Sequence, residues 1–336
     1  MKVAWSLLWV LFLTSFTFSV RLFAYTPSNN GGIFNDYKRA LKVNPSEVEQ
    51  LTLNGYEEIP NGVYKFKNLK KLTIRNGLKS IPNDINKIGK IESLILIDNP
   101  ITSIPENIRA CIAIQEIKII NSQLQSLPSA LFELPNLVSL TIKNGQLVSL
   151  PTITQDNYVL KTLNLKNNHI SSISDDIQHL IGMEGFYCSG NPIKTFIGEF
   201  DNPKAFKNFK TLVMRDCGLE HIPFALCNNL QYLDVSGNKI TDIDEAELTF
   251  MNNLLFIGLE DNPITYINEK LFSLAKLKSI QIDRYESLSI ELSELSNVCI
   301  TYIAVNMEII DKNYKPCGQR KGMVSVFFSE PGKRRK

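Results

Sequence analysis

Apolar residues recur at fixed positions along most of the chain, in units of about 23 residues. The unit is clearest from Ile91 to Pro105, IESLILIDNPITSIP, which reads L-x-x-L-x-L-x-x-N-x-L-x-x-L-P when any aliphatic residue counts as L. Side chains alternate between the two faces of a strand, so each L-x-L predicts a short strand with both apolar side chains pointing inward. Twelve such pairs occur, spaced 21 to 26 residues apart: Leu51/Leu53, Leu72/Ile74, Leu94/Leu96, Ile117/Ile119, Leu140/Ile142, Leu163/Leu165, Phe186/Cys188, Leu212/Met214, Leu233/Val235, Ile257/Leu259, Ile280/Ile282 and Ile303/Val305.

Units of this size cannot bury their own apolar face, so they must stack on one another to form a continuous core. The predicted fold class is an α/β-type repeat solenoid, a horseshoe with a parallel concave sheet and an irregular or short-helical convex side. Adjacent strands lie about 4.8 Å apart, so twelve of them give an inner arc of about 50 Å.

A polar position follows each predicted strand, where the chain turns off the sheet. An asparagine there offers both donors and an acceptor to backbone groups that would otherwise be buried without partners. We therefore predict a structural ladder of Asn99, Asn168, Asn191, Asn238 and Asn262. Ser122, Gly145 and Cys217 replace the asparagine in other units, which interrupts the ladder and predicts softer turns there.

These motifs resemble the leucine-rich repeat superfamily, in particular bacterial exported proteins with repeats of about 23 residues. The resemblance covers residues 48 to about 305, and it implies a curved solenoid whose concave sheet binds another macromolecule. The pattern departs from the family in two units. The seventh carries three extra residues around Gly198 to Ala205, and Tyr285 takes the asparagine place in the eleventh.

The ends of the chain differ from the repeats. Residues 1–24 combine Lys2, an apolar run and small residues, which predicts a signal peptide cleaved after Ser19 or Ala24; an uncleaved membrane anchor is the alternative. Residues 25–47 predict a lead-in and a capping helix from Ile33 to Leu41. The repeats then fill 48–305. Residues 306–336 predict a C-terminal cap, in which GMVSVFFSEP adds a terminal strand, and a basic tail.

The N-terminal segment predicts an exported protein, whether secreted, periplasmic or at the cell surface. No asparagine stands in an N-x-Ser/Thr sequon with a permitted middle residue; the nearest approach, Asn44-Pro45-Ser46, is blocked by its proline. This favours a bacterial protein over a secreted eukaryotic one. Contact with the membrane is expected only if the N-terminal segment stays uncleaved.

The remaining composition argues against catalysis and nucleic-acid binding. The net charge is +2, with Lys and Glu interspersed, and the six cysteines have neither the paired nor the even spacing of a zinc site or disulfide framework. No nucleophile elbow, P-loop or zinc-protease motif occurs. The carboxylate pairs Asp175-Asp176 and Glu245-Glu247 fall in the outer halves of repeats, where we expect a solvated face. We therefore predict a protein with no enzymatic activity, no cofactor and no metal.

Candidate binding residues occupy the outward positions of the predicted strands. Basic residues gather in the middle units and aromatic residues in the later ones, and exposed aromatic side chains in a row favour a contact surface over simple solvation. The predicted partner is a protein; the alternative is a cell-surface adhesion or envelope protein that binds a glycan. The predicted concave contact residues are Lys118, Lys143, Lys166, Tyr187, Arg215, Tyr232, Phe256 and Tyr302.

Overall fold

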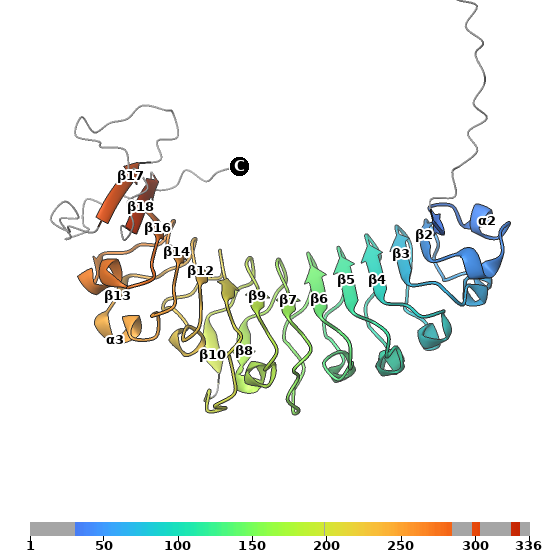
Figure 1. Ribbon diagram of the computed structural model, residues 1–336, viewed down its shortest axis with the longest axis horizontal. Helices are drawn as coiled ribbons and strands as arrows, with labels where there is room; N and C mark the ends of the chain where they lie inside the picture. Colours follow the sequence, from blue (N-terminus) through green and yellow to red (C-terminus); the bar gives the residue numbers. More distant parts are fainter. Residues whose placement is uncertain (1–30, 198, 284–297, 303–323, 330–336) are drawn as a thin grey trace, which may run out of the picture.

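A computed structural model describes residues 31–197, 199–283, 298–302 and 324–329 of the chain. The predicted signal segment, Tyr285 and the predicted basic tail lie outside the described residues. Within the described part, one strand from each repeat joins a long parallel sheet, and the turns between strands cover its other side, as Figure 1 shows. The predicted repeat solenoid is confirmed.

Among the described residues, the main sheet has fourteen strands in the order β1-β2-β3-β4-β5-β6-β7-β9-β11-β12-β14-β16-β18-β17. Their bounds are β1 Ile33–Phe34, β2 Gln50–Asn54, β3 Lys71–Arg75, β4 Ser93–Ile97, β5 Glu116–Ile120, β6 Ser139–Lys143, β7 Thr162–Asn164, β9 Gly185–Tyr187, β11 Thr211–Val213, β12 Tyr232–Asp234, β14 Phe256–Gly258, β16 Ser279–Asp283, β17 Val298–Tyr302 and β18 Val324–Ser329. Two parallel pairs lie outside this sheet, β8 Ser172–Ser174 with β10 Thr195–Ile197, and β13 Asp242–Ile243 with β15 Tyr266–Ile267.

The register of the sheet follows the apolar pairs. Leu51 stands opposite Leu72, Leu72 opposite Leu94, and the match continues strand by strand as far as Ile257 opposite Ile280. Both members of each of these pairs are buried, with at most 2% of their surface exposed. A slip of one residue would turn every apolar pair to solvent, which is why the pattern specifies the register so firmly.

Short turns of 3-10 helix form much of the outer side, where proline recurs at their start. Pro60, Pro105 and Pro128 each take an extended conformation directly before such a turn, as proline's fixed φ favours. The 3-10 turns span Pro45–Glu47, Asn61–Lys65, Ile85–Lys87, Glu106–Ala110, Ser129–Leu131, Asp175–His179, Phe224–Leu226 and Glu269–Ser273, and one α-helical turn, α3, spans Glu245–Leu248.

Two columns of side chains follow the strands. The five predicted asparagines are buried and bond to backbone groups of their own repeat and the preceding one; Asn99, for example, donates to the carbonyl of Ile74 at 2.9 Å and accepts from the N–H of Leu78 at 2.9 Å. One residue earlier lies a second column, exposed or partly exposed, that the sequence pattern did not predict. Its residues take the left-handed backbone conformation, with positive φ, in ten successive repeats: Gly55, Asn76, Asp98, Asn121, Asn144, Asn167, Gly190, Asp216, Gly237 and Asp261.

Four members of this exposed column, from Asp98 to Asn167, also form a hydrogen-bonded ladder. The side-chain amide of Asn167 donates to the side-chain oxygen of Asn144 at 2.9 Å, and that of Asn144 donates to Asn121 at 2.9 Å. The amide of Asn121 donates to the carboxylate of Asp98. Asparagine, aspartate and glycine tolerate positive φ better than other residues, so their recurrence has a backbone cause.

The N-terminal cap differs from the predicted helix. Ile33–Phe34 forms the edge strand β1, parallel to β2, and helix α2 covers only Tyr37–Ala40. The expected start at Ile33 is wrong because Asp36 is the N-cap: its carboxylate accepts from the N–H of Lys38 at 2.8 Å, which begins the helix there.

The C-terminal end also departs from the sequence order. The chain segment GMVSVFFSEP does add a strand, β18, as expected, but this strand lies directly beside β16. The strand β17, which ends at Tyr302, lies beyond it at the sheet's edge. The expectation that a strand at Ile303/Val305 follows Ile280/Ile282 directly is therefore wrong, because β18 fills that place; Ile303 and Val305 themselves lie outside the described residues.

The insertion in the seventh repeat packs onto the outer side. The rings of Phe196, Phe200, Phe206 and Phe209 follow one another with centroids 5.8 to 6.3 Å apart. The side-chain oxygen of Gln178 accepts a hydrogen bond from the N–H of Asn202 in this loop at 2.9 Å. The extra residues are therefore attached away from the main sheet.

Candidate functional site

The outward side chains of the main sheet form three columns, which lie before, between and after the buried pair of each strand. Lys118 and Tyr187 stand in the middle column, on β5 and β9. Tyr232 and Phe256 stand in the column before the pair, and Lys143, Lys166 and Arg215 stand in the column after it. Apart from Lys118 and Tyr187 in the middle column, the predicted basic and aromatic residues therefore occupy opposite margins of the same face. The side chain of Tyr302 lies outside the described residues.

Tyr232 and Phe256 form a stacked aromatic pair. They stand directly opposite each other on β12 and β14, with ring centroids 4.4 Å apart and planes inclined by 8°. Tyr232 is 38% exposed and Phe256 is partly exposed. Burial of the phenol and the nearby Asp234 carboxylate raise the pKa of Tyr232, so its hydroxyl stays neutral at ordinary pH. The pair offers a rigid apolar surface with one polar tip.

Tyr187 lies on β9, two strands before the strand of Tyr232, and its position depends on a neighbouring glycine. A Cβ at Gly185 would lie 3.0 Å from the Tyr187 ring, so the missing side chain gives the ring its space. The ammonium of Lys166 lies 5.7 Å from the centre of the same ring, within the range of a cation–π contact. The basic and aromatic margins therefore meet at Tyr187.

Arg215 is held in place by a buried carboxylate. Its guanidinium lies 3.1 Å from Asp234, whose side chain is only 5% exposed. The other oxygen of Asp234 accepts from the N–H and hydroxyl of Ser236, at 3.2 and 2.8 Å. A Cβ at Gly258 would lie 2.8 Å from that oxygen, so glycine is needed beside it. Arg215 is thus positioned and partly neutralised, unlike the lysines.

Several residues of this face escaped the sequence reasoning although they stand at outward positions. Asp234, Gly185 and Gly258 support the predicted side chains. Ile95, Ile97 and Ile120 are partly exposed on β4 and β5, where other repeats carry polar residues. The strand period marks all six positions as outward-facing, but none of them carries a basic or aromatic side chain of the kind on which the predicted contact surface rests.

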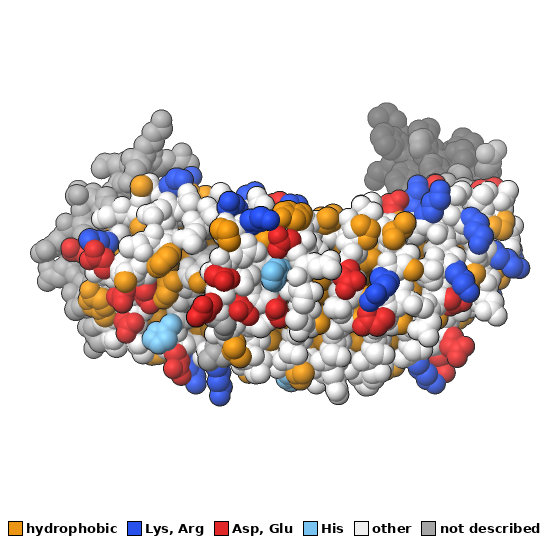
Figure 2. Space-filling view, turned by 90° about the horizontal axis from the view of Figure 1, so that it is seen from below, with side chains coloured by type: hydrophobic (Ala, Val, Ile, Leu, Met, Phe, Trp, Pro, Cys, Tyr) orange, Lys and Arg blue, Asp and Glu red, His pale blue; other side chains and the backbone are white. Residues whose placement is uncertain are grey.

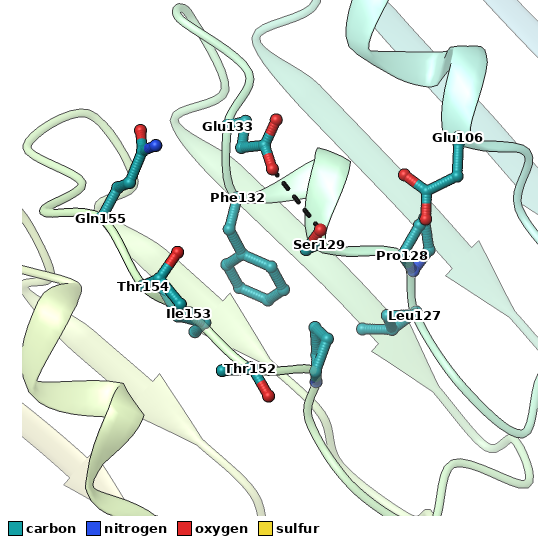
Figure 3. A pocket seen from close by; sticks show the side chains of 11 residues that line it. Glu106, Leu127, Pro128, Ser129, Phe132, Glu133, Thr152, Ile153, Thr154 and Gln155 are labelled. Carbon is teal, nitrogen blue, oxygen red and sulfur yellow. Dashed lines mark hydrogen bonds between the residues drawn. The ribbon is translucent and has the colours of Figure 1, made fainter.

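The outer side offers weaker candidates. Figure 2, seen from the side of the turns, shows acidic, basic and apolar side chains intermixed. The pocket of Figure 3 has a volume of about 390 Å³, with Phe132 turned into it and Glu106 and Glu133 at its margin. These carboxylates lie 3.1 and 4.0 Å from Arg109, and no catalytic pair converges there. The predicted carboxylate pairs serve structure: Asp175 accepts from the N–H of Glu199 and Glu245 bonds Lys270.

The described residues contain no cluster of three His, Cys, Asp or Glu that could hold a metal ion. Cys188 and Cys217 are buried, 0% and 2% exposed, as small core residues, and both are free thiols. Cys217 takes the place of a ladder asparagine and donates its S–H to the carbonyl of Cys188 at 3.4 Å. Across the ranges that the structure describes, no helix has the length and apolar character needed to span a bilayer.

A family model described as the BspA type leucine-rich repeat region matches residues 47–183 and 198–312 in six copies. The chain belongs to this family. The predicted resemblance to leucine-rich repeat proteins is thereby confirmed. Proteins with this fold commonly mediate interactions with other proteins, and they are generally binding scaffolds without catalysis.

Known relatives agree on the fold. Decorin of Rattus norvegicus is 30% identical over 96 residues, which are 29% of this chain; the match spans only 26% of decorin. A leucine-rich repeat protein of Leptospira interrogans superposes with a TM-score of 0.62 at 21% identity, over 76% of this chain and 80% of the other.

Two further solved structures place this fold in protein complexes. The complex of latrophilin 3, Unc5D and the leucine-rich repeats of FLRT2 gives a TM-score of 0.61 at 19% identity, over 72% of this chain and 77% of that one. The Toll–Spätzle complex of Drosophila gives 0.56 at 20% identity, over 80% of this chain and 40% of that one.

Proposed function

We propose that this leucine-rich repeat chain is an exported, non-catalytic module that binds a protein partner through its concave face. The observation that carries the proposal is the stacked pair of Tyr232 and Phe256. Two aromatic rings kept parallel and exposed on a rigid sheet lose little side-chain entropy on binding, which suits them to anchor a partner.

The surroundings of this pair support the same use. Arg215 is fixed by buried Asp234, and Lys166 lies over Tyr187, so charged groups are held beside the rings. Buried aromatic and arginine side chains give most of the affinity in protein interfaces, whereas cations at the margin set the rate of encounter. We therefore infer that the aromatic residues supply most of the binding affinity and that Lys118, Lys143 and Lys166 raise the rate of association.

A glycan partner fits this geometry less well. Sugar rings pack best on an open aromatic face, and the stacking of Tyr232 on Phe256 covers one face of each ring. The glycan alternative therefore depends on the uncovered face of each of the two rings and on Tyr187.

The proposal that the chain is exported depends on the predicted signal peptide in residues 1–24.

Affinity capture with the purified chain, read by mass spectrometry, identifies the partner. We expect a protein whose association slows with Lys143→Ala and Lys166→Ala and whose association rate then depends less on salt. Lys70→Ala and Lys79→Ala are matched controls, since these lysines pair with Glu49 and Glu57 away from the concave columns. Capture of a glycan alone, or equal effects of both pairs of substitutions, would overturn the proposal.

A further inference from the structure

The N-terminal half of the concave sheet carries an aliphatic patch that the aromatic site does not include. Ile95 and Ile97 project from β4, and Ile120 projects from β5 directly opposite Ile97. All three are partly exposed, although the corresponding positions on neighbouring strands hold threonine, lysine or arginine. Apolar side chains gathered on a solvent face cost solubility, so such a cluster marks a contact surface.

Positive charge frames this patch. Arg75 stands opposite Ile97 on one side, and Lys143 stands opposite Ile120 on the other. Lys118 stands opposite Ile95. The isoleucines therefore lie within a frame of three cations on four adjacent strands, β3 to β6.

The cations of this frame are not engaged by carboxylates nearby. Some other described lysines pair with a carboxylate of a neighbouring repeat, as Lys70 does with Glu49 and Lys161 with Glu184. Arg75, Lys118 and Lys143 make no ion pair with any described residue. The nearby carboxylates are engaged, since Glu116 accepts from the hydroxyl of Ser93 at 2.7 Å and Asp98 accepts from Asn121.

We propose that the patch of Ile95, Ile97 and Ile120 with its frame of Arg75, Lys118 and Lys143 docks an acidic polypeptide segment that carries aliphatic or aromatic side chains. The inference rests on the proposed use of the concave face for protein binding, but on residues separate from the aromatic pair. Carboxylates of the segment meet the unpaired cations, and its apolar side chains cover the isoleucines.

The dimensions and the apolar floor favour a polypeptide over another polyanion. From β3 to β6, three strand spacings cover about 14 Å, which an extended segment of about four residues spans. A nucleic acid or sulfated glycan would use the cations but gain nothing from the three isoleucines.

The test is selection of a phage-displayed random peptide library on the purified chain. We expect the selected peptides to combine Asp or Glu with aliphatic or aromatic residues. They should bind Ile97→Thr with Ile120→Thr at least about tenfold more weakly, and bind Lys118→Gln with Lys143→Gln more weakly and with a smaller salt dependence. Threonine already stands at outward positions 73 and 141, so the isoleucine variants should fold, which equal thermal unfolding verifies.

Three results would overturn the inference: selection of no peptides, selection of peptides without acidic residues, or unchanged affinity for the isoleucine variant. Binding of heparin fragments or single-stranded DNA that ignores the isoleucine substitutions would also count against it. If peptides lose affinity only for Tyr232→Ala with Phe256→Ala, the inference fails while the proposed function stands.

Discussion

The side-chain amide of Asn168 donates a hydrogen bond to the carbonyl oxygen of Ile142, one repeat earlier, over 2.9 Å. The same amide group donates to the carbonyl of Leu165 at 2.8 Å, and its oxygen accepts from the N–H of Leu147 at 3.3 Å. One buried side chain thus satisfies three backbone groups in two repeats.

Asn168→Ala should therefore destabilise the protein by about 3 kcal/mol, because it leaves buried backbone groups without partners. Asn144→Gly is the matched control: Asn144 belongs to the exposed left-handed column, where Gly190 and Gly237 stand naturally. We expect the control to cost less than about 1 kcal/mol. Urea unfolding of both variants measures the difference, and equal losses would contradict the distinct roles of the two columns.

Leu165→Asp should abolish the single cooperative unfolding transition, because it buries an unpaired charge within the stack. Leu96→Asp should do the same in an earlier repeat. Lys166→Asp, next in sequence but facing outward, should leave the transition nearly unchanged. Thermal unfolding followed by circular dichroism compares them, and wild-type melting of Leu165→Asp would contradict its inward orientation.

Much of this fold could be predicted because two sequence periods determine it: the two-residue alternation of side chains along a strand and the repeat of about 23 residues. The pairs from Leu51/Leu53 to Ile280/Ile282 gave the strands and their register, since the side-chain period of a strand allows only one burial pattern. The position of β18 between β16 and β17 could not be predicted, because sequence order alone does not decide which of two apolar strands pairs first.

The candidate site was predictable in part. The strand period placed Tyr232 and Phe256 next to each other, whereas the support of Arg215 by Asp234 required the fold. The space that Gly185 and Gly258 provide becomes visible only when neighbouring strands are brought together, because the missing Cβ matters only against the adjacent repeat.

Glu247 should give stability a pH dependence near neutrality. Its carboxylate forms a capping box with Asp244 at the start of α3, and desolvation raises its pKa from 4.5 to about 7. The folded chain then holds the proton more tightly than the unfolded chain, so this group's contribution to the free energy of unfolding is full below about pH 4.5 and is lost as pH rises through 7.

Glu247→Gln should remove that contribution. Urea unfolding at several pH values between 4.5 and 7.5 compares the variant with the wild type, and the stability difference between them should change with pH in this range. Glu245→Gln, on the same turn and paired with Lys270, serves as the control. A difference that stays constant with pH would contradict the raised pKa.

Exported protein should begin near Val20 or Tyr25, if the predicted signal is cleaved after Ser19 or Ala24. N-terminal sequencing of material recovered from outside the cytoplasm determines the first residue. Material that begins at Met1 would instead support the membrane anchor.

The concave aromatic pair is the centre of this account, and the affinity of the captured partner for aromatic variants tests it most directly. Tyr266→Ala with Phe250→Ala is the matched control, because these exposed aromatic residues lie outside the main sheet. We predict that Tyr232→Ala with Phe256→Ala weakens binding by at least about 2 kcal/mol, roughly thirtyfold in Kd, with a smaller effect on stability. Unchanged affinity for this variant, with loss in the control, would place the partner on the outer side and contradict the account.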